Sequence, residues 1–178
     1  SLNCGLGSKD NKKNVFENIE IVSKKLNCEK EKIVTLNQIH SNKVVYFDNL
    51  EKIEDRPVGD AIVTKLTNIG IGILTADCLP ILICDPKKKI IGCIHAGWKG
   101  ALSGIIENTL DKFLELKCNL KDLVFAVGPC INYLHYEVDH YFYNKFLTQS
   151  KNNDEFFTIS KDKKYYFNIR NYVNSKLV

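Results

Sequence analysis

Two histidines and one cysteine stand at the ends of apolar segments, where a fold can bring distant groups together. His40 lies in a polar stretch between two β-rich runs, Cys78 ends the loop after residues 69–74, and His95 follows the apolar residues 90–94. Loops at strand ends are frequent places for binding and catalytic groups. Two imidazoles and one thiolate can hold zinc and leave a fourth position for water or substrate. These residue types predict a metal site, at which zinc would lower the pKa of its water toward neutrality.

The spacing of these three residues leaves other interpretations open. They lie far apart in sequence and form no compact ligand motif, so only the fold can bring them together. A buried thiol and two hydrogen-bonded histidines would give the same pattern. Cys78 could also be a thiolate nucleophile with His95 as its base. A chelator distinguishes a zinc enzyme from a thiol enzyme, because it inactivates the first and spares the second.

Two charged residues beside the predicted ligands are candidates for catalysis. Asp77 directly precedes Cys78, and a carboxylate there can act as a general base or support the ligands. Lys99 lies in the turn of residues 95–100, His-Ala-Gly-Trp-Lys-Gly, between an apolar strand and a predicted helix. Small residues there let the backbone come close to an anion, and Lys99 can stabilise a phosphate or a developing negative charge. A tight turn with a solvated lysine is the alternative interpretation.

The hydrophobic pattern predicts strands that alternate with helices. Apolar residues at helical spacing predict a helix over residues 14–26 and another over residues 101–114. Short β-rich runs predict strands at residues 33–36, 44–47, 59–64, 69–74, 81–84, 90–94 and 123–127. A helix is expected at residues 141–147, a hairpin at residues 156–169 and a last helix from Asn171. This order is typical of an α/β fold, here one domain over residues 1–178 with mixed β-sheets layered with helices.

The composition argues against several classes of protein. No apolar run reaches the roughly 20 residues of a membrane-spanning helix. The net charge of +4 is spread over short lysine patches, which predicts neither a nucleic-acid nor a membrane partner. Seven cysteines, an odd number without a CxxC pair, together with the lack of a secretory signal, predict reduced thiols in a cytoplasmic protein. Cys84 and Cys93 are expected to be buried, and the oligomeric state is not readable.

Short blocks along nearly the whole chain also carry a family resemblance. The blocks are residues 1–3 (Ser-Leu-Asn), 38–41 (Gln-Ile-His-Ser), 59–61 (Gly-Asp-Ala), 75–80 (Thr-Ala-Asp-Cys-Leu-Pro), 95–100, 128–131 (Gly-Pro-Cys-Ile) and 136–138 (Tyr-Glu-Val). In this order they resemble the YfiH family, also called the laccase-domain or polyphenol-oxidase family. Three departures stand out: a preceding glycine-rich segment and a following cysteine- and arginine-bearing stretch are absent, and His135 stands where a cysteine is frequent. The chain has no Met, so we expect it to lack a native N-terminal segment, and the resemblance implies that a C-terminal segment is missing as well.

The resemblance implies a function as well as a fold. It implies zinc on His40, Cys78 and His95, and phosphorolysis of adenosine, inosine or methylthioadenosine with purine nucleoside and phosphate as substrates. Adenosine deamination is implied as a second activity. Copper-dependent phenol oxidation ranks lower, because multicopper oxidases need about ten histidines, by the preference of copper centres for imidazole, and this chain has four. A module that binds a nucleotide without turnover is a further alternative.

Overall fold

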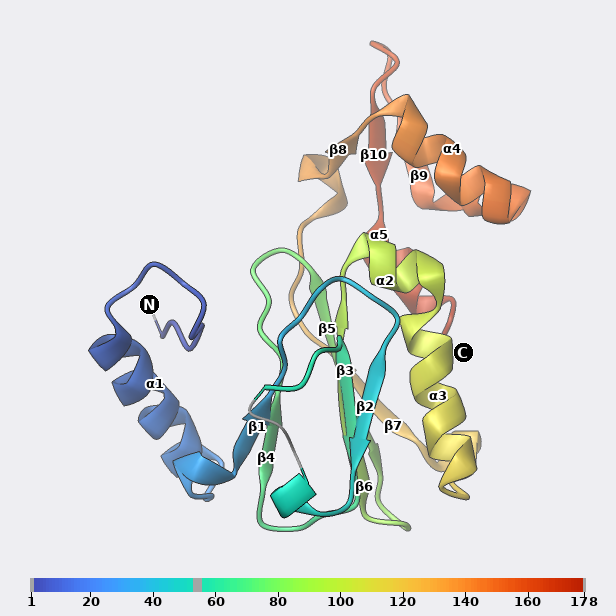
Figure 1. Cartoon of the computed structure of the whole chain (residues 1–178). Coiled ribbons are helices and arrows are strands. Elements are labelled where there is room, and N and C mark those ends of the chain that lie inside the picture. Colours follow the sequence, from blue (N-terminus) through green and yellow to red (C-terminus); the bar gives the residue numbers. More distant parts are fainter. Residues whose placement is uncertain (1, 53–55, 178) are drawn as a thin grey trace.

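The computed structural model describes residues 2–52 and 56–177, and the predicted helices and strands occur in the predicted order, with a further short strand at residues 137–138 that was not predicted (Figure 1). The helices are α1 (Lys12–Lys25), α2 (Trp98–Ser103), α3 (Ile105–Glu115), α4 (His140–Gln149) and α5 (Ile169–Asn174). The strands are β1 (Ile33–Thr35), β2 (Val44–Phe47), β3 (Ala61–Thr64), β4 (Gly70–Gly72), β5 (Leu79–Asp85), β6 (Ile90–Ala96), β7 (Val124–Val127), β8 (Glu137–Val138), β9 (Phe157–Ile159) and β10 (Tyr165–Phe167). The predicted α/β class with mixed sheets is therefore confirmed.

A five-stranded mixed sheet forms the centre of the molecule, in the order β2-β3-β6-β5-β7. Strands β2 and β3 are parallel, and the other neighbours are antiparallel. Side chains of β5 alternate, so that Leu79, Ile81 and Ile83 are buried on one face. Helix α3 contacts β2, β3 and β6, and its Ile106 and Phe113 are fully buried. Residues of β5 and β6 belong to the same buried cluster as these α3 residues, and both strands lead to the candidate site.

The helix expected at residues 101–114 is two helices in the structure. Helix α2 ends and α3 begins at Gly104, which has a left-handed φ of 95°. Glycine adopts this conformation without steric cost. The apolar spacing continues on both sides of Gly104, and for this reason periodicity alone predicted a single helix. The predicted helix began at Ala101, whereas α2 begins at Trp98.

A smaller two-stranded parallel sheet, β1–β4, lies beside the central sheet, with α1 on its outer side (Figure 1). Its residues pack with a second apolar cluster built on Leu36, Ile62 and Cys93. Cys93 is buried as expected, whereas Cys84 is only half-buried, because it lies on the face of β5 opposite to the buried Ile81 and Ile83. All seven cysteines are free thiols.

The C-terminal part forms a third, antiparallel sheet in the order β8-β10-β9, with α4 and α5. The expected hairpin is β9 and β10. Aromatic rings join these elements: Phe146 lies 4.6 Å from Phe167 and 5.0 Å from Tyr172, centroid to centroid. The last helix begins at Ile169, earlier than Asn171, because the Asn168 side chain caps it by accepting the backbone N–H of Asn171.

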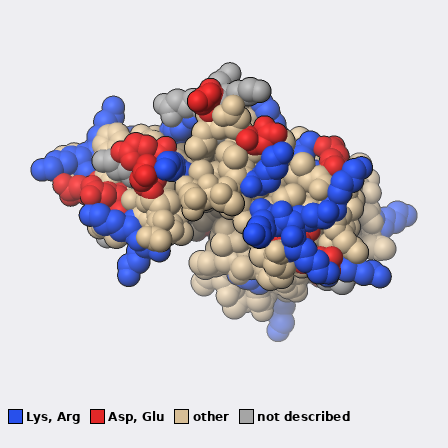
Figure 2. All heavy atoms as spheres, turned by 90° about the horizontal axis from the view of Figure 1, so that it is seen from below, with Lys and Arg blue, Asp and Glu red and all other residues tan. Residues whose placement is uncertain are grey.

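Charged side chains are spread unevenly over the surface. Seen from below, Lys and Arg gather on the right of the molecule and mix with Asp and Glu on the left (Figure 2). One of the predicted lysine patches forms the turn between β5 and β6, where Lys87 pairs with Asp122 at 2.7 Å. This turn is at the opposite end of the two strands from His95. Among the described residues, none of the helices has the length and apolar character that crossing a bilayer requires.

Candidate metal centre

Three chain segments bring the predicted ligands together at one end of the central sheet. The β5–β6 hairpin pairs Pro80 with His95, so that Cys78, just before β5, lies beside the end of β6. His40 comes from the loop between β1 and β2 and has a left-handed φ of 59°. A non-glycine residue in this region carries some strain, which surrounding contacts must hold in place. The loop therefore presents His40 in a conformation that other residues maintain.

The side chains of these three residues form one compact cluster. One nitrogen of each histidine and the cysteine sulfur all lie within 4.8 Å of one another. The Sγ of Cys78 is 3.8 Å from Nε2 of His40, and the two imidazole rings meet edge to face with centroids 4.8 Å apart. His95 is buried, Cys78 is half-buried and His40 is exposed. Two nitrogen donors and one sulfur donor, open on the His40 side, suit a zinc ion with a free coordination position.

A fully buried carboxylate, Asp60, lies directly behind the cluster. Its Oδ1 lies within hydrogen-bond distance, 2.8 Å, of Nδ1 of His95 and accepts the backbone N–H of His40 at 3.0 Å. Its Oδ2 accepts from the backbone N–H of Ser41 at 2.7 Å and from the Ser41 hydroxyl at 2.8 Å. Burial by itself raises the pKa of Asp60, but the hydrogen bonds from His95, Ser41 and His40 outweigh it and leave this pKa below its ordinary value. Asp60 is therefore an ionised acceptor that contacts both histidine segments.

The side chains of His95 and Cys78 are neutral in the metal-free protein. Burial lowers the pKa of His95, the charge of His40 lowers it further, and the hydrogen bond to Asp60 opposes both. Burial raises the pKa of the Cys78 thiol, and the charges of Asp77 and Asp60 add to this. A neutral imidazole can ligate a metal directly, and a metal replaces the thiol proton. Without a metal, the raised pKa leaves little nucleophilic thiolate on Cys78.

Gly97, which lies between β6 and α2, and Gly100, in the first turn of α2, allow the segments to touch. A Cβ on Gly97 would lie 2.7 Å from Cδ2 of His40 and 3.2 Å from Sγ of Cys78. A Cβ on Gly100 would lie 2.7 Å from the carbonyl oxygen of Ser41. The small residues of this segment were expected to let an anion approach the backbone. In the structure, the space in front of Gly97 is taken by the His40 and Cys78 side chains.

Comparison with known protein families matches the whole chain to one family. The family described as "Multi-copper polyphenol oxidoreductase laccase" matches residues 1–178. The chain belongs to this laccase family. The resemblance to YfiH is confirmed by structure, since the chain superposes on a crystal structure of the Bacillus licheniformis hypothetical protein YfiH with a TM-score of 0.90. Their sequences are 25% identical, and the match covers 99% of this chain and 70% of that one.

Other relatives of this laccase-family chain carry a different name. A protein of Rickettsia prowazekii (strain Madrid E) named "Purine nucleoside phosphorylase RP494" is 36% identical over 94% of this chain and 68% of its own length. "Purine nucleoside phosphorylase RC0672" of Rickettsia conorii is 37% identical over 93% of this chain and 70% of its own. A Neisseria meningitidis protein, NMB0706, superposes with a TM-score of 0.87 at 29% identity, covering 99% of this chain and 70% of that one.

The two predicted catalytic residues occupy different surroundings in this laccase-family fold. Asp77 is exposed, and its charge contributes to the raised pKa of Cys78. Its carbonyl oxygen accepts the backbone N–H of Ile131 at 2.9 Å, which joins the Cys78 loop to residues 128–131. Lys99 is also exposed, and its ammonium lies 5.6 Å from the ring centroid of Trp98. Asp77 therefore lies close to the cluster, whereas the recorded contact of Lys99 is with its own helix.

Three polar residues near the cluster were given no role from sequence. Asp60 was placed in a predicted strand and in a family block but given no role, and its hydrogen bonds to residues about 20 and 35 positions away cannot be read from spacing. Gln38 clamps Leu74 through both ends of its amide, at 2.7 Å each, and so ties the His40 loop to the segment before Cys78. Burial, followed by the charges of Cys78 and Asp77, raises the pKa of Tyr136 to about 12. All three lie in blocks of the family resemblance, which was the available signal.

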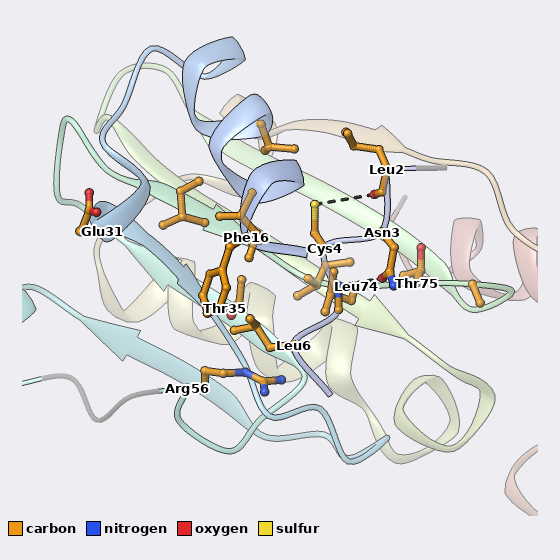
Figure 3. A pocket seen from close by; sticks show the side chains of 17 residues that line it. Leu2, Asn3, Cys4, Leu6, Phe16, Glu31, Thr35, Arg56, Leu74 and Thr75 are labelled. Carbon is orange, nitrogen blue, oxygen red and sulfur yellow. Dashed lines mark hydrogen bonds between the residues drawn. The ribbon is translucent and has the colours of Figure 1, made fainter. Parts of the chain in front are cut away.

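A separate cavity of about 840 Å³ lies between the N-terminal segment, α1 and the β1–β4 sheet (Figure 3). Its walls are mostly apolar, and Figure 3 shows Glu31 at the left edge, Arg56 at the lower left, and Leu2 and Thr75 on the right. Nη2 of Arg56 donates to the carbonyl oxygen of Leu36 at 3.1 Å. The cavity is bordered by Thr75 and Ala76, which lead directly to Asp77 and Cys78, but none of the three predicted ligands lines it.

Proposed function

We propose that this protein is a zinc-dependent purine nucleoside phosphorylase that acts on adenosine, inosine and methylthioadenosine and also deaminates adenosine. The single observation that carries the proposal is the convergence of His40, Cys78 and His95, whose ligand atoms lie within 4.8 Å of one another. Membership of the laccase family and the names of the Rickettsia relatives support it. The reactions are adenosine plus phosphate to adenine plus ribose 1-phosphate, and adenosine plus water to inosine plus ammonia.

The chain's own residues divide the work in this proposal. His40, Cys78 and His95 would hold the zinc, which supplies a Lewis acid and an activated water when bound. Asp77, exposed beside Cys78, is in position to accept or donate a proton at its carboxylate. Lys99 would attract phosphate through its charge, after its side chain leaves the face of Trp98. The exposed side of His40 would give the nucleoside its path to the site.

The donor set favours zinc over a multicopper arrangement. The laccase description implies several copper ions, each with several imidazole ligands. Of the four histidines, His140 bonds the Tyr165 hydroxyl at 3.0 Å and His135 is exposed in a separate turn. Among residues 2–52 and 56–177, His40, Cys78 and His95 form the one recognised group of potential metal ligands. One thiolate and two imidazoles suit a single zinc ion.

Elemental analysis joined to product analysis tests the proposal. The purified protein is assayed for zinc and copper, then incubated with adenosine and phosphate, and the products are separated chromatographically. We expect one zinc per chain, free adenine with ribose 1-phosphate, some inosine, and loss of all products after chelation. If metallated protein yields neither free base nor inosine, the proposal fails.

The same experiment separates the alternative functions. Activity that survives chelation but is lost when Cys78 is alkylated would identify a thiol hydrolase. Oxygen uptake with a phenolic substrate that scales with bound copper would identify an oxidase. Cys130→Ser is the matched control for Cys78→Ser, because Cys130 is also a half-buried free thiol but is not part of the cluster.

A further inference from the structure

We propose that Asp60 positions the metal ligands before any metal binds, by fixing which ring nitrogen His95 offers and by holding the backbone on either side of His40. The proposal rests on the proposed metal site and deepens it. Asp60 lies in the block Gly-Asp-Ala at the start of β3 and was not among the predicted site residues.

Asp60 acts first on the tautomer of His95. The carboxylate of Asp60 is fully buried, and its Oδ1 lies 2.8 Å from Nδ1 of His95. An ionised carboxylate only accepts hydrogen bonds, so the proton of the neutral imidazole must sit on Nδ1. The lone pair of Nε2 is then free for a metal. Carboxylates that accept the second ring N–H of a ligating histidine orient the ring and raise its basicity.

Asp60 also acts on the loop that carries His40. The same carboxylate accepts the backbone N–H groups of Ile39, His40 and Ser41 at 3.3, 3.0 and 2.7 Å, and the Ser41 hydroxyl at 2.8 Å. Three consecutive N–H groups that converge on one carboxylate set the backbone of this loop. They also hold His40 at its φ of 59°, a conformation that costs free energy in a residue other than glycine.

Both steps act through a single side chain, which couples the two histidines. With the bond to His95 included, Asp60 accepts five hydrogen bonds. An asparagine has the same size but must turn an NH₂ group toward some of these donors. If the NH₂ faces His95, it favours the tautomer with the proton on Nε2, the wrong one for the metal. If the NH₂ faces Ser41, it points at the backbone N–H groups of the loop, and because both are donors no hydrogen bond forms.

Gln38 offers a control that separates the two steps. Its amide ties the same loop to Leu74 on the other side, through Nε2 to the carbonyl oxygen and through Oε1 to the N–H, at 2.7 Å each. Both of these hydrogen bonds go to Leu74, and neither involves His95. Gln38→Ala should therefore loosen the His40 loop without any change in the tautomer of His95.

The experiment measures zinc affinity and tautomer on wild type, Asp60→Asn and Gln38→Ala. Zinc affinity is measured by competition with a chromophoric chelator, and the tautomer by ¹⁵N-edited NMR of the histidine rings in metal-free protein. Circular dichroism and thermal unfolding confirm that each variant is folded. We expect a 10–100-fold weaker zinc affinity for Asp60→Asn, the usual effect of losing such a partner. His95 should carry its proton on Nδ1 in wild type and in Gln38→Ala, but not uniformly in Asp60→Asn.

Two results would overturn the inference. One is a folded Asp60→Asn variant that binds zinc within twofold of wild type. The other is metal-free wild type with the His95 proton on Nε2, and this measurement decides the question even if Asp60→Asn fails to fold. Wild type that binds no zinc at all would instead overturn the proposed function, so the two failures are distinguishable.

Discussion

The metal-centre end of the central sheet and the C-terminal aromatic layer are held together in different ways. At the centre, directional hydrogen bonds to Asp60 and a glycine contact place His40 beside Cys78. In the aromatic layer, the phenyl ring of Phe146 contacts the rings of Phe157, Phe167 and Tyr172 through faces and edges, and a phenyl ring neither donates nor accepts a conventional hydrogen bond. Apolar burial tolerates small changes of shape, whereas a directional site does not. The two regions should therefore fail separately and for different reasons.

The largest effect expected is the loss of the metal on removal of a ligand. His40→Ala, Cys78→Ala and His95→Ala should each lower zinc from one per chain to near zero, because two donors do not hold the ion at ordinary concentrations. Inductively coupled plasma mass spectrometry on dialysed protein measures this. His135→Ala is the matched control and should keep full zinc, since His135 lies outside the cluster. Full zinc in two of the three ligand variants would contradict the assignment.

A substitution in the aromatic layer should have the opposite result, a loss of stability without a loss of zinc. Phe146 is fully buried, and Phe146→Ala should lower the free energy of unfolding by about 3–5 kcal/mol, the usual cost of removing a buried ring. Urea denaturation measures this, and the folded fraction should still bind one zinc. Tyr141→Ala on the same helix, 69% exposed, should cost about 0.5–1 kcal/mol through its lost contact with Lys145. Zinc loss that parallels the stability loss would show that the two regions are coupled.

A single added methyl group sharpens the contrast at the metal centre. Gly97→Ala places a Cβ 2.7 Å from the His40 ring, so the ring must move, and zinc binding should weaken by about 1–3 kcal/mol, the usual cost of overpacking. Chelator competition measures the affinity. Gly7→Ala is the control, because an added Cβ there meets nothing within 4 Å. Equal affinities for both variants would show that His40 is not held against Gly97.

The smallest effect expected is a difference in thiol labelling. Cys93 is fully buried, and burial raises its pKa to about 12, so almost no thiolate exists at pH 8. Iodoacetamide should leave Cys93 unlabelled with or without zinc, whereas chelation should increase the labelling of half-buried Cys78. Peptide mass spectrometry measures both sites. Labelling of Cys93 in the native protein would show that the core of the central sheet opens.

Much of the fold was predictable because it depends on local pattern. Short apolar runs, β-branched in β5 and following a turn in β6, predicted both strands, and helical spacing predicted α1. The break at Gly104 was missed, since apolar spacing continues across it and only the left-handed φ separates the helices. Boundaries also shifted where a cap decides them, as at Asn168 before α5. Local rules identify the elements, but a single residue decides where some of them end.

By itself, the sequence determined the chemistry available: two imidazoles and a thiol at strand ends, in blocks that resemble one family. Only the tertiary structure decided that these groups meet, because the pairing of Pro80 with His95 and the return of the His40 loop depend on strand register. A shift of one residue would turn His95 to the other face of the sheet. The same register buries Asp60 behind both histidines, and no spacing rule connects residues so far apart in the chain.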